Sequence, residues 1–375
     1  SLPYPLIVGA PVIFEAAATY STATVFDSNS NKVVISYRDV GNSSYGTSVV
    51  GTVSGTTITF GTPVVFETAS VNHLRATFDS NSNKVVIVYS DVGNSSYGTA
   101  IVGTVSGTSI SFGTAVVYNS SGISDSGVTF DSTNNKVVIA YQHNTNSNYG
   151  TAIVGTVSGT AISFGTDVVF ETASVASVAA TFDSANNKVV IAYKDEGNSS
   201  YGTAIIGTVS GTAISFGTAA VFEAASTTYI TATFDSNANK VAIAYKDNGT
   251  TYGTAVVGTV SATSISFGTA VVFETASTNN STATFDSSSN RVVISYTDAG
   301  NSSHGTSIAG TISGTSISFG TPVVFEATST TYITATFDSV NNKTVTAYQN
   351  SATYGSAVVS NIPNLLTIGT DYFVQ

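Results

Sequence analysis

The chain has 375 residues, of which 42% are hydrophobic and 9% are charged, and its formal net charge is -11. Its 11 Lys and Arg residues are outnumbered by 22 Asp and Glu residues, so it lacks the basic surface that nucleic acids and anionic membranes require. The absence of cysteine excludes disulfides, thiol catalysis and cysteine metal sites, and no apolar run reaches the ~18 residues of a membrane span.

One phrase recurs through the whole chain. A Phe-Asp turn occurs seven times, with a spacing of 52 residues that shortens once to 51. Its Phe residues are Phe26, Phe78, Phe130, Phe182, Phe234, Phe285 and Phe337. Repeats of this length, built of strands and turns, are typical of β-propellers, in which each repeat buries its faces against its neighbours. The sequence therefore predicts an all-β fold, a seven-bladed β-propeller.

Residues 180–223 illustrate one repeat in chain order. Apolar stretches rich in β-branched residues, separated by polar turns, predict four antiparallel strands. These strands are expected over residues 180–182, 188–193, 201–209 and 212–222. The fourth strand should kink at Gly217. Residues 223–229 are long enough to cross from the outer edge of one blade to the inner strand of the next.

The two chain ends indicate how a ring would be closed. Residues 9–15 match the fourth-strand phrase of residues 61–67, so a displaced strand can complete the last blade. Residues 365–374 also resemble a fourth strand, and the sequence does not decide between the two ends. We expect a single domain over 1–375, with 1–20 and 362–375 as partial closing segments. The alternative, a β-solenoid or fibrous stack, would separate the termini.

The repeated phrase F-D-S-x-x-N-K-V-V-I-A-Y-x-D-x-G-N-S-S-Y-G-T-A resembles repeats in uncharacterised proteins of marine phages and bacteria, over nearly the whole chain. The resemblance implies an extracellular or virion-associated repeat protein and carries no catalytic signature. Segments that begin at Asp39, Asp91, Asp195 and Asp298 also resemble the Asp-box of sialidase-like propellers. An Asp-box is a structural turn, so this second resemblance implies no hydrolysis.

Two sets of carboxylates recur in the repeats. The first opens the polar turn, where a short carboxylate can accept backbone N–H bonds in an Asx-turn. Its members are Asp27, Asp79, Asp131, Asp183, Asp235, Asp286 and Asp338. The second set ends the fourth strand, where edge charges that discourage sheet stacking are favoured over a cation site. Its members are Glu15, Glu67, Glu171, Glu223, Glu274 and Glu326, with Asn119 at the seventh place.

Cationic and histidine residues show no catalytic or metal pattern. His73, His143 and His304 occupy unrelated repeat positions, which argues against one metal site. Arg38, Arg75 and Arg291 sit in different parts of their repeats, whereas a sialidase-type site gathers several Arg around a carboxylate. Nothing singles out a pair of carboxylates for glycoside hydrolysis. We therefore expect no enzyme activity, no metal and no cofactor.

The crossover segments vary among repeats whose strands barely differ. Function resides in such segments when the scaffold is rigid, and in a propeller they surround one mouth of the channel. The predicted binding residues are Tyr20, His73, Arg75, Tyr229, Asn279, Asn280 and Tyr332. Neutral drift after recent duplication is the competing explanation.

These observations favour a non-enzymatic structural or adhesive propeller of a virion or cell surface, one that contacts a host receptor. The alternatives are a carbohydrate-binding lectin and, third, a sialidase-like glycan hydrolase. Expected partners are a glycan or surface protein and other structural proteins of the virion or cell surface. Nucleic acid and a membrane span are not expected.

Overall fold

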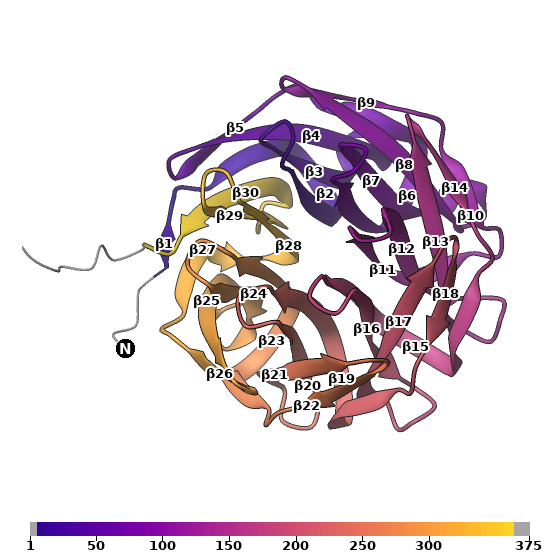
Figure 1. Ribbon diagram of the computed structural model, residues 1–375. Helices are drawn as coiled ribbons and strands as arrows, with labels where there is room; N and C mark the ends of the chain where they lie inside the picture. The colour runs from indigo at the N-terminus through magenta and orange to yellow at the C-terminus, as the bar shows by residue number, and fades with distance from the viewer. Residues whose placement is uncertain (1–5, 364–375) are drawn as a thin grey trace, which may run out of the picture.

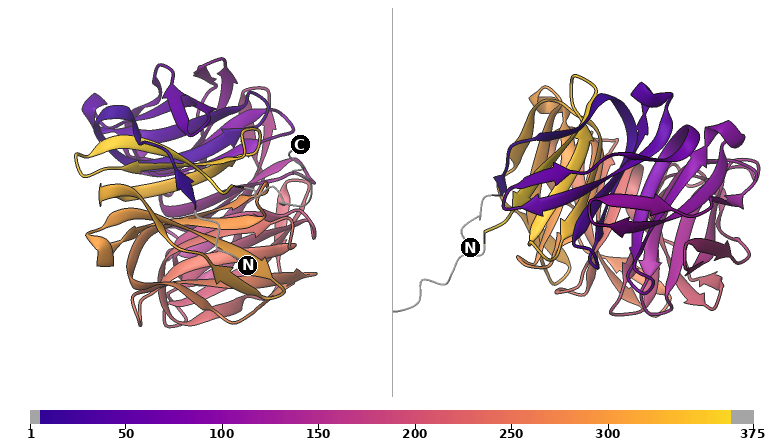
Figure 2. Two further views of the ribbon diagram at one scale, coloured as in Figure 1. Left: turned by 90° about the vertical axis from the view of Figure 1, so that its left-hand side faces the viewer. Right: turned by 90° about the horizontal axis from the view of Figure 1, so that it is seen from above.

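The computed structural model describes residues 6–363, and Figure 1 shows their strands arranged around a central axis. The regular structure of these residues consists of strands and three short 3-10 turns, η1 (Val40–Asn42), η2 (Val92–Asn94) and η3 (Ala299–Asn301). Turned by 90° in either direction, the molecule has the outline of a thick disc (Figure 2). None of the described elements is a helix long and apolar enough to cross a membrane. The all-β propeller architecture predicted from the repeats is confirmed.

Four kinds of strand recur in order. The long strands are β2 (Val12–Asp27), β6 (Val64–Asp79), β15 (Val168–Asp183), β19 (Ala220–Asp235) and β23 (Val271–Asp286), and two further copies are each split, as β10 (Val116–Asn119) and β11 (Ile123–Asp131) and as β27 (Val323–Ser329) and β28 (Thr331–Asp338). The second strands are β3 (Lys32–Asp39), β7 (Lys84–Asp91), β12 (Lys136–His143), β16 (Lys188–Asp195), β20 (Lys240–Asp247), β24 (Arg291–Asp298) and β29 (Lys343–Gln349).

The third strands are β4 (Tyr45–Ser54), β8 (Tyr97–Ser106), β13 (Tyr149–Ser158), β17 (Tyr201–Ser210), β21 (Tyr252–Ser261), β25 (His304–Ser313) and β30 (Tyr354–Asn361). Short strands follow them: β5 (Thr57–Phe60), β9 (Ser109–Phe112), β14 (Ala161–Phe164), β18 (Ala213–Phe216), β22 (Ser264–Phe267) and β26 (Ser316–Phe319). A two-residue strand, β1 (Ile7–Val8), precedes them all.

Each unit is a four-stranded antiparallel sheet, as the sequence predicts. The second half of β19 pairs with β20, β20 pairs with β21, and β21 pairs with both β22 and the first half of β23. The fourth strand is therefore made of two pieces with a kink between them. In the preceding unit this kink falls at Gly217, where an added Cβ would lie 1.8 Å from the backbone oxygen of Thr263 in the next unit.

The prediction that residues 223–229 form a crossover loop is wrong, although these residues do connect two units. Ala220–Asp235 is a single strand that leaves one unit and enters the next without a loop. The pairing register shifts between Thr228 and Thr231, so a β-bulge absorbs the change of direction. The variable residues thus lie on an extended, hydrogen-bonded strand.

The N-terminal strand completes the last unit. Val12 and Ile13 of β2 pair with Ala357 and Ser356 of β30, and β1 pairs with the end of the same strand. Figure 1 shows β1 beside β30. The competing segment expected within 362–375 lies, from residue 364 on, outside the described residues.

The strand pairing forms two open sheets, of 13 and 17 strands. They end where the long strand is interrupted, between β10 and β11 and between β27 and β28. A closed sheet is thus not observed among residues 6–363, and the closed ring of seven blades stays a prediction.

The core lies between adjacent units. One cluster joins Ala192, Ile206 and Phe222 of one unit to Val241 and Tyr245 of the next. Second strands are buried on both faces, which explains their continuous apolar sequence.

The glutamates that end the fourth strand belong to these interfaces, and their interpretation as edge charges is wrong. The hydroxyl of Tyr245 donates to the Glu223 carboxylate across the interface at 2.8 Å. Equivalent Tyr–Glu bonds of 2.8 to 3.2 Å recur six times. A buried phenol needs an acceptor, and the glutamate of the preceding unit supplies it.

The Asx-turns are as expected. The Asp235 carboxylate accepts hydrogen bonds from the backbone N–H of Asn237 at 2.9 Å and of Ala238 at 2.8 Å. The turn after the second strand is built in the same manner, because Asp39 accepts from the N–H of Asn42 at 3.0 Å. Burial, followed by the nearby Glu15, raises the pKa of Asp39. These carboxylates hold turns, and the likeness to an Asp-box stays a resemblance.

Candidate functional site

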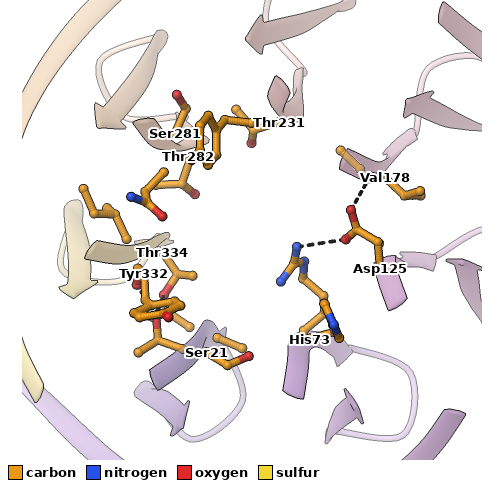
Figure 3. Close-up of a pocket in the computed structure, with 18 of the residues that line it drawn as sticks. Ser21, His73, Asp125, Val178, Thr231, Ser281, Thr282, Tyr332 and Thr334 are labelled. Carbon is orange, nitrogen blue, oxygen red and sulfur yellow. Dashed lines mark hydrogen bonds and ion pairs between the residues drawn. The ribbon is translucent and has the colours of Figure 1, made fainter. Parts of the chain in front are cut away.

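A cavity of about 750 Å³ lies at the centre of the molecule, lined by the inner halves of the long strands (Figure 3). Each inner strand contributes the residue at its bulge. We call these seven residues the bulge ring, and they are Ser21, His73, Asp125, Ser177, Tyr229, Asn280 and Tyr332. This position holds five different residue types, as do the positions directly before and after it, whereas most strand positions hold far fewer.

The backbone of the bulge ring is unusual. Six of its members have positive φ angles of 49 to 52°, a left-handed conformation that residues other than glycine rarely adopt. Such a conformation costs free energy and persists only where its surroundings enforce it. All seven residues of the bulge ring line the cavity.

Hydrogen bonds between neighbouring units reach three of these bulges. The Ser21 hydroxyl accepts from the backbone N–H of Leu74 at 3.0 Å, and the Ser126 hydroxyl donates to the carbonyl of His73 at 3.3 Å. The Thr22 hydroxyl donates to the carbonyl of Tyr332. The scaffold therefore holds the bulges at Ser21, His73 and Tyr332 in place.

One side of the cavity is aromatic. The side chains of Tyr229 and Tyr332 are 40% and 37% exposed, which is unusual for large apolar rings in this protein. The ring of Tyr20 meets that of Tyr332 edge-on, with centroids 5.3 Å apart. The guanidinium carbon of Arg38 lies 4.8 Å from the Tyr20 centroid. These groups offer flat faces for stacking beside cationic donors.

The other side of the cavity is charged. An Arg75 guanidinium nitrogen lies 3.6 Å from an Asp125 carboxylate oxygen, and the two side chains are 41% and 20% exposed. Arg75 also donates to the carbonyl of Leu74 at 2.8 Å, and Asp125 accepts from the N–H of Val178 at 3.3 Å. Figure 3 shows Asp125 and Tyr332 on opposite sides of the opening.

His73 lies next to this pair. Burial lowers the pKa of His73, and the positive charge of Arg75 lowers it further while Asp125 opposes the shift. The positive charge of a protonated His73 is therefore disfavoured at this place. Within residues 6–363, no three His, Asp or Glu side chains gather in a way that could hold a metal ion.

The structure brings together six of the seven residues predicted to bind. Tyr20, His73, Arg75, Tyr229, Asn280 and Tyr332 all line the cavity. Asn279 is not among the lining residues, and its amide oxygen instead accepts from the Lys246 ammonium at 3.2 Å. Whether the six bind a ligand stays a prediction.

Sequence reasoning missed Asp125 and Arg38. Asp125 stands at the repeat position of His73, so a comparison of equivalent positions could have found it. The sequence predicts that Arg38 and Arg75 are separated in space, because the two occupy different positions in their repeats. That separation is wrong in space: the Arg38 guanidinium donates to the Asn72 amide at 2.6 Å, and Asn72 lies on the strand that carries Arg75.

The chain matches no family model, and no curated protein matches it. Among solved structures, the BP39L lectin from Burkholderia pseudomallei is similar over 94% of this chain and 99% of that chain, with a TM-score of 0.66 and 10% identity. AofleA from Arthrobotrys oligospora is similar over 84% of this chain and 91% of that chain, with a TM-score of 0.53 and 10% identity. An arginine-to-alanine triple mutant of AofleA gives a TM-score of 0.55 at 10% identity. At such identities these likenesses show a shared propeller fold.

Proposed function

We propose that this protein is a carbohydrate-binding propeller that holds one saccharide in its central cavity and performs no chemistry on it. The observation that carries the proposal is the pair of half-exposed tyrosines, Tyr229 and Tyr332, held on left-handed bulges around a polar cavity. A solvent-exposed aromatic ring gives a sugar a flat apolar surface, and neighbouring polar groups bond to its hydroxyls. A similar fold in a protein described as a lectin supports this choice.

The size and lining of the cavity suit a small ligand. Its volume of about 750 Å³ lies within the ~300–1,000 Å³ that is usual for ligand sites. Asn280, His73 and the Arg75–Asp125 pair supply planar donors and acceptors around it. Because bonds between units fix the bulges at Ser21, His73 and Tyr332, less ordering of these residues is needed on binding.

We propose one saccharide per chain because the lining residues differ from repeat to repeat. A protein with equivalent pockets would keep the binding residues alike in all its repeats. Here the scaffold positions are alike and the bulge ring varies. Binding without turnover is favoured because Asp125 is the one carboxylate among the described residues that line the cavity, whereas glycoside hydrolysis uses a pair.

An adhesive role is part of the same proposal. A saccharide-binding propeller displayed on a virion or a cell surface would attach that surface to a host receptor. The observation that supports an extracellular or virion-associated location, with structural proteins of that surface as partners, is the resemblance of the repeats to those of marine phage and bacterial proteins. Purification of the protein from such particles tests the location.

A glycan array tests the proposed function. Serine occupies the bulge with the same backbone at Ser21 and Ser177, so Tyr229→Ser and Tyr332→Ser should fold normally. We expect wild type to bind a defined set of glycans and both variants to lose that binding. The matched control is Tyr201→His, outside the cavity, where His304 holds the equivalent place. Equal binding by wild type and both serine variants would overturn the proposal.

A further inference from the structure

Basic residues are distributed unevenly in this acidic chain. Seven of the 11 occupy one repeated position opposite the Asx-turn aspartate, at the far end of the inner strand from the bulge. They are Lys32, Lys84, Lys136, Lys188, Lys240, Arg291 and Lys343. The other four are Arg38, Arg75, Lys194 and Lys246, and of these the two arginines line the cavity.

Arg75 is positioned to receive a ligand. One of its terminal nitrogens donates to the Leu74 carbonyl, and the other lies 3.6 Å from Asp125. These contacts orient the guanidinium and leave some of its N–H donors available for a ligand. A guanidinium has five N–H donors in a planar fork that matches a carboxylate. With 41% of its side chain exposed, Arg75 can use the remaining donors without a rearrangement.

Arg38 adds a second positive charge to the lining. Its guanidinium is held by the Asn72 amide at 2.6 Å and by the face of Tyr20. The Asp125 carboxylate is shared between Arg75 and the backbone, because its two oxygens also accept from the N–H groups of Ser126 at 2.9 Å and Val178 at 3.3 Å. Two arginines against one aspartate leave the lining net positive in a chain of net charge -11.

We propose that the saccharide bound in this cavity carries a carboxylate, which Arg75 receives while the sugar ring lies against the tyrosines on the other side. This inference rests on the proposed function and names the class of sugar, an acidic monosaccharide unit. The carboxylates of the Tyr–Glu interfaces and of the Asp39-type turns lie outside the lining, so Asp125 is the one carboxylate of the described residues that borders the proposed site.

The test compares each acid with its own uncharged ester. The probes are the methyl glycosides of glucuronic acid, galacturonic acid and N-acetylneuraminic acid, each beside its carboxyl methyl ester, titrated by ligand-observed NMR. We expect at least one acid to bind wild type about tenfold or more tightly than its ester, which is the strength of one charge-assisted hydrogen bond. Added salt should weaken binding of the acid and leave the ester unchanged.

Two variants locate the preference. Arg75→Thr uses the residue that three other repeats carry at this position, Thr231, Thr282 and Thr334, so the fold should persist. It should reduce the acid-to-ester ratio to about one. Lys194→Thr removes the same charge at the repeat position of Arg38, outside the cavity, with Thr297 as its precedent, and should keep the ratio.

Three results would overturn the inference. An acid preference that persists in Arg75→Thr would place the carboxylate elsewhere. Binding of esters as tight as that of acids, if lost in Tyr332→Ser, would leave the proposed function intact and remove the acidic specificity. Failure of all three acids to bind, together with binding of neutral glycans on an array, would likewise keep the proposed function and remove the acidic specificity.

Discussion

The hydroxyl of Tyr141 donates to the carboxylate of Asp167 at 3.3 Å, whereas the equivalent tyrosine of every other repeat donates to a glutamate. The third repeat has Asn119 where that glutamate belongs, and Asp167 stands where the other repeats have Pro or Ala. The carboxylate has thus moved to the short connection before β15 and still reaches the equivalent buried phenol. This exchange indicates that the Tyr–carboxylate bond is maintained because the interface needs an acceptor.

Asp167→Ala should lower the free energy of unfolding by about 0.5–1 kcal/mol, because the phenol loses its charged acceptor; the loss is limited since Asp167 is exposed and water can replace it. In a chain that carries Asn119→Glu, the same substitution should cost almost nothing. Urea denaturation of the four proteins of this double-mutant cycle measures the difference. Equal costs in both backgrounds would contradict the exchange.

Tyr118→Phe should stabilise the protein. The Tyr118 hydroxyl is buried without a hydrogen-bond partner among the described residues, and the six other repeats have Phe at this place. Removing an unsatisfied buried hydroxyl should raise the free energy of unfolding by about 1 kcal/mol, which thermal denaturation detects as a higher Tm. A lower Tm would show that this hydroxyl has a partner that the interface requires.

Two glycines of one unit should respond very differently to alanine. Gly217→Ala places a Cβ 1.8 Å from the Thr263 backbone oxygen and should cost about 3 kcal/mol through displacement of the next unit. Gly211 has a φ of +62° with open space around it, and Ala262 occupies the equivalent turn with a φ of 54°. Gly211→Ala should therefore cost only about 1 kcal/mol. Similar melting temperatures for the two variants would argue against the tight approach between units.

Stability should fall on acidification through His73. Its pKa in the folded protein lies below the ordinary value of 6.5, so the unfolded chain takes up the proton first as the pH falls through that value. The contribution of His73 is thus fully present above this pH and is lost below it. His73→Asn, with the residue that Asn280 shows at the same bulge, should lose less stability than wild type between about pH 7.5 and pH 5.5. Urea unfolding at the two pH values compares them, and identical pH dependence would mean that His73 titrates normally.

Much of the scaffold could be predicted from sequence because it depends on local rules. The turn at Asp235 and the kink at Gly217 follow from residue type and strand period alone. The partner of Glu223 could not be found in this way, since Tyr245 lies in the next unit and the contact depends on how two sheets pack. The proximity of Arg38 and Arg75 could not be predicted for the same reason, since it also depends on how neighbouring sheets pack.

Variation among the repeats indicates where the candidate site lies. Which residues of that segment face the cavity depends on the backbone conformation, which the sequence does not reveal. Asn279 and Asn280 are neighbours of the same type on one strand. Only the left-handed bulge at Asn280 decides which of them lines the cavity. A β-bulge shifts the alternation of side chains between the two faces of a strand, so beyond a bulge the alternation alone does not predict which residues face inward.

Calorimetric titration of the strongest glycan found on the array tests the central claim most directly, because it gives both the number of sites and their dependence on the cavity. We predict one saccharide per chain for wild type and the loss of measurable binding in the double variant Tyr229→Ser and Tyr332→Ser, with far-ultraviolet circular dichroism unchanged. Several saccharides per chain, bound with the same affinity by the double variant, would contradict a single central site and place binding in the repeated surfaces of the units.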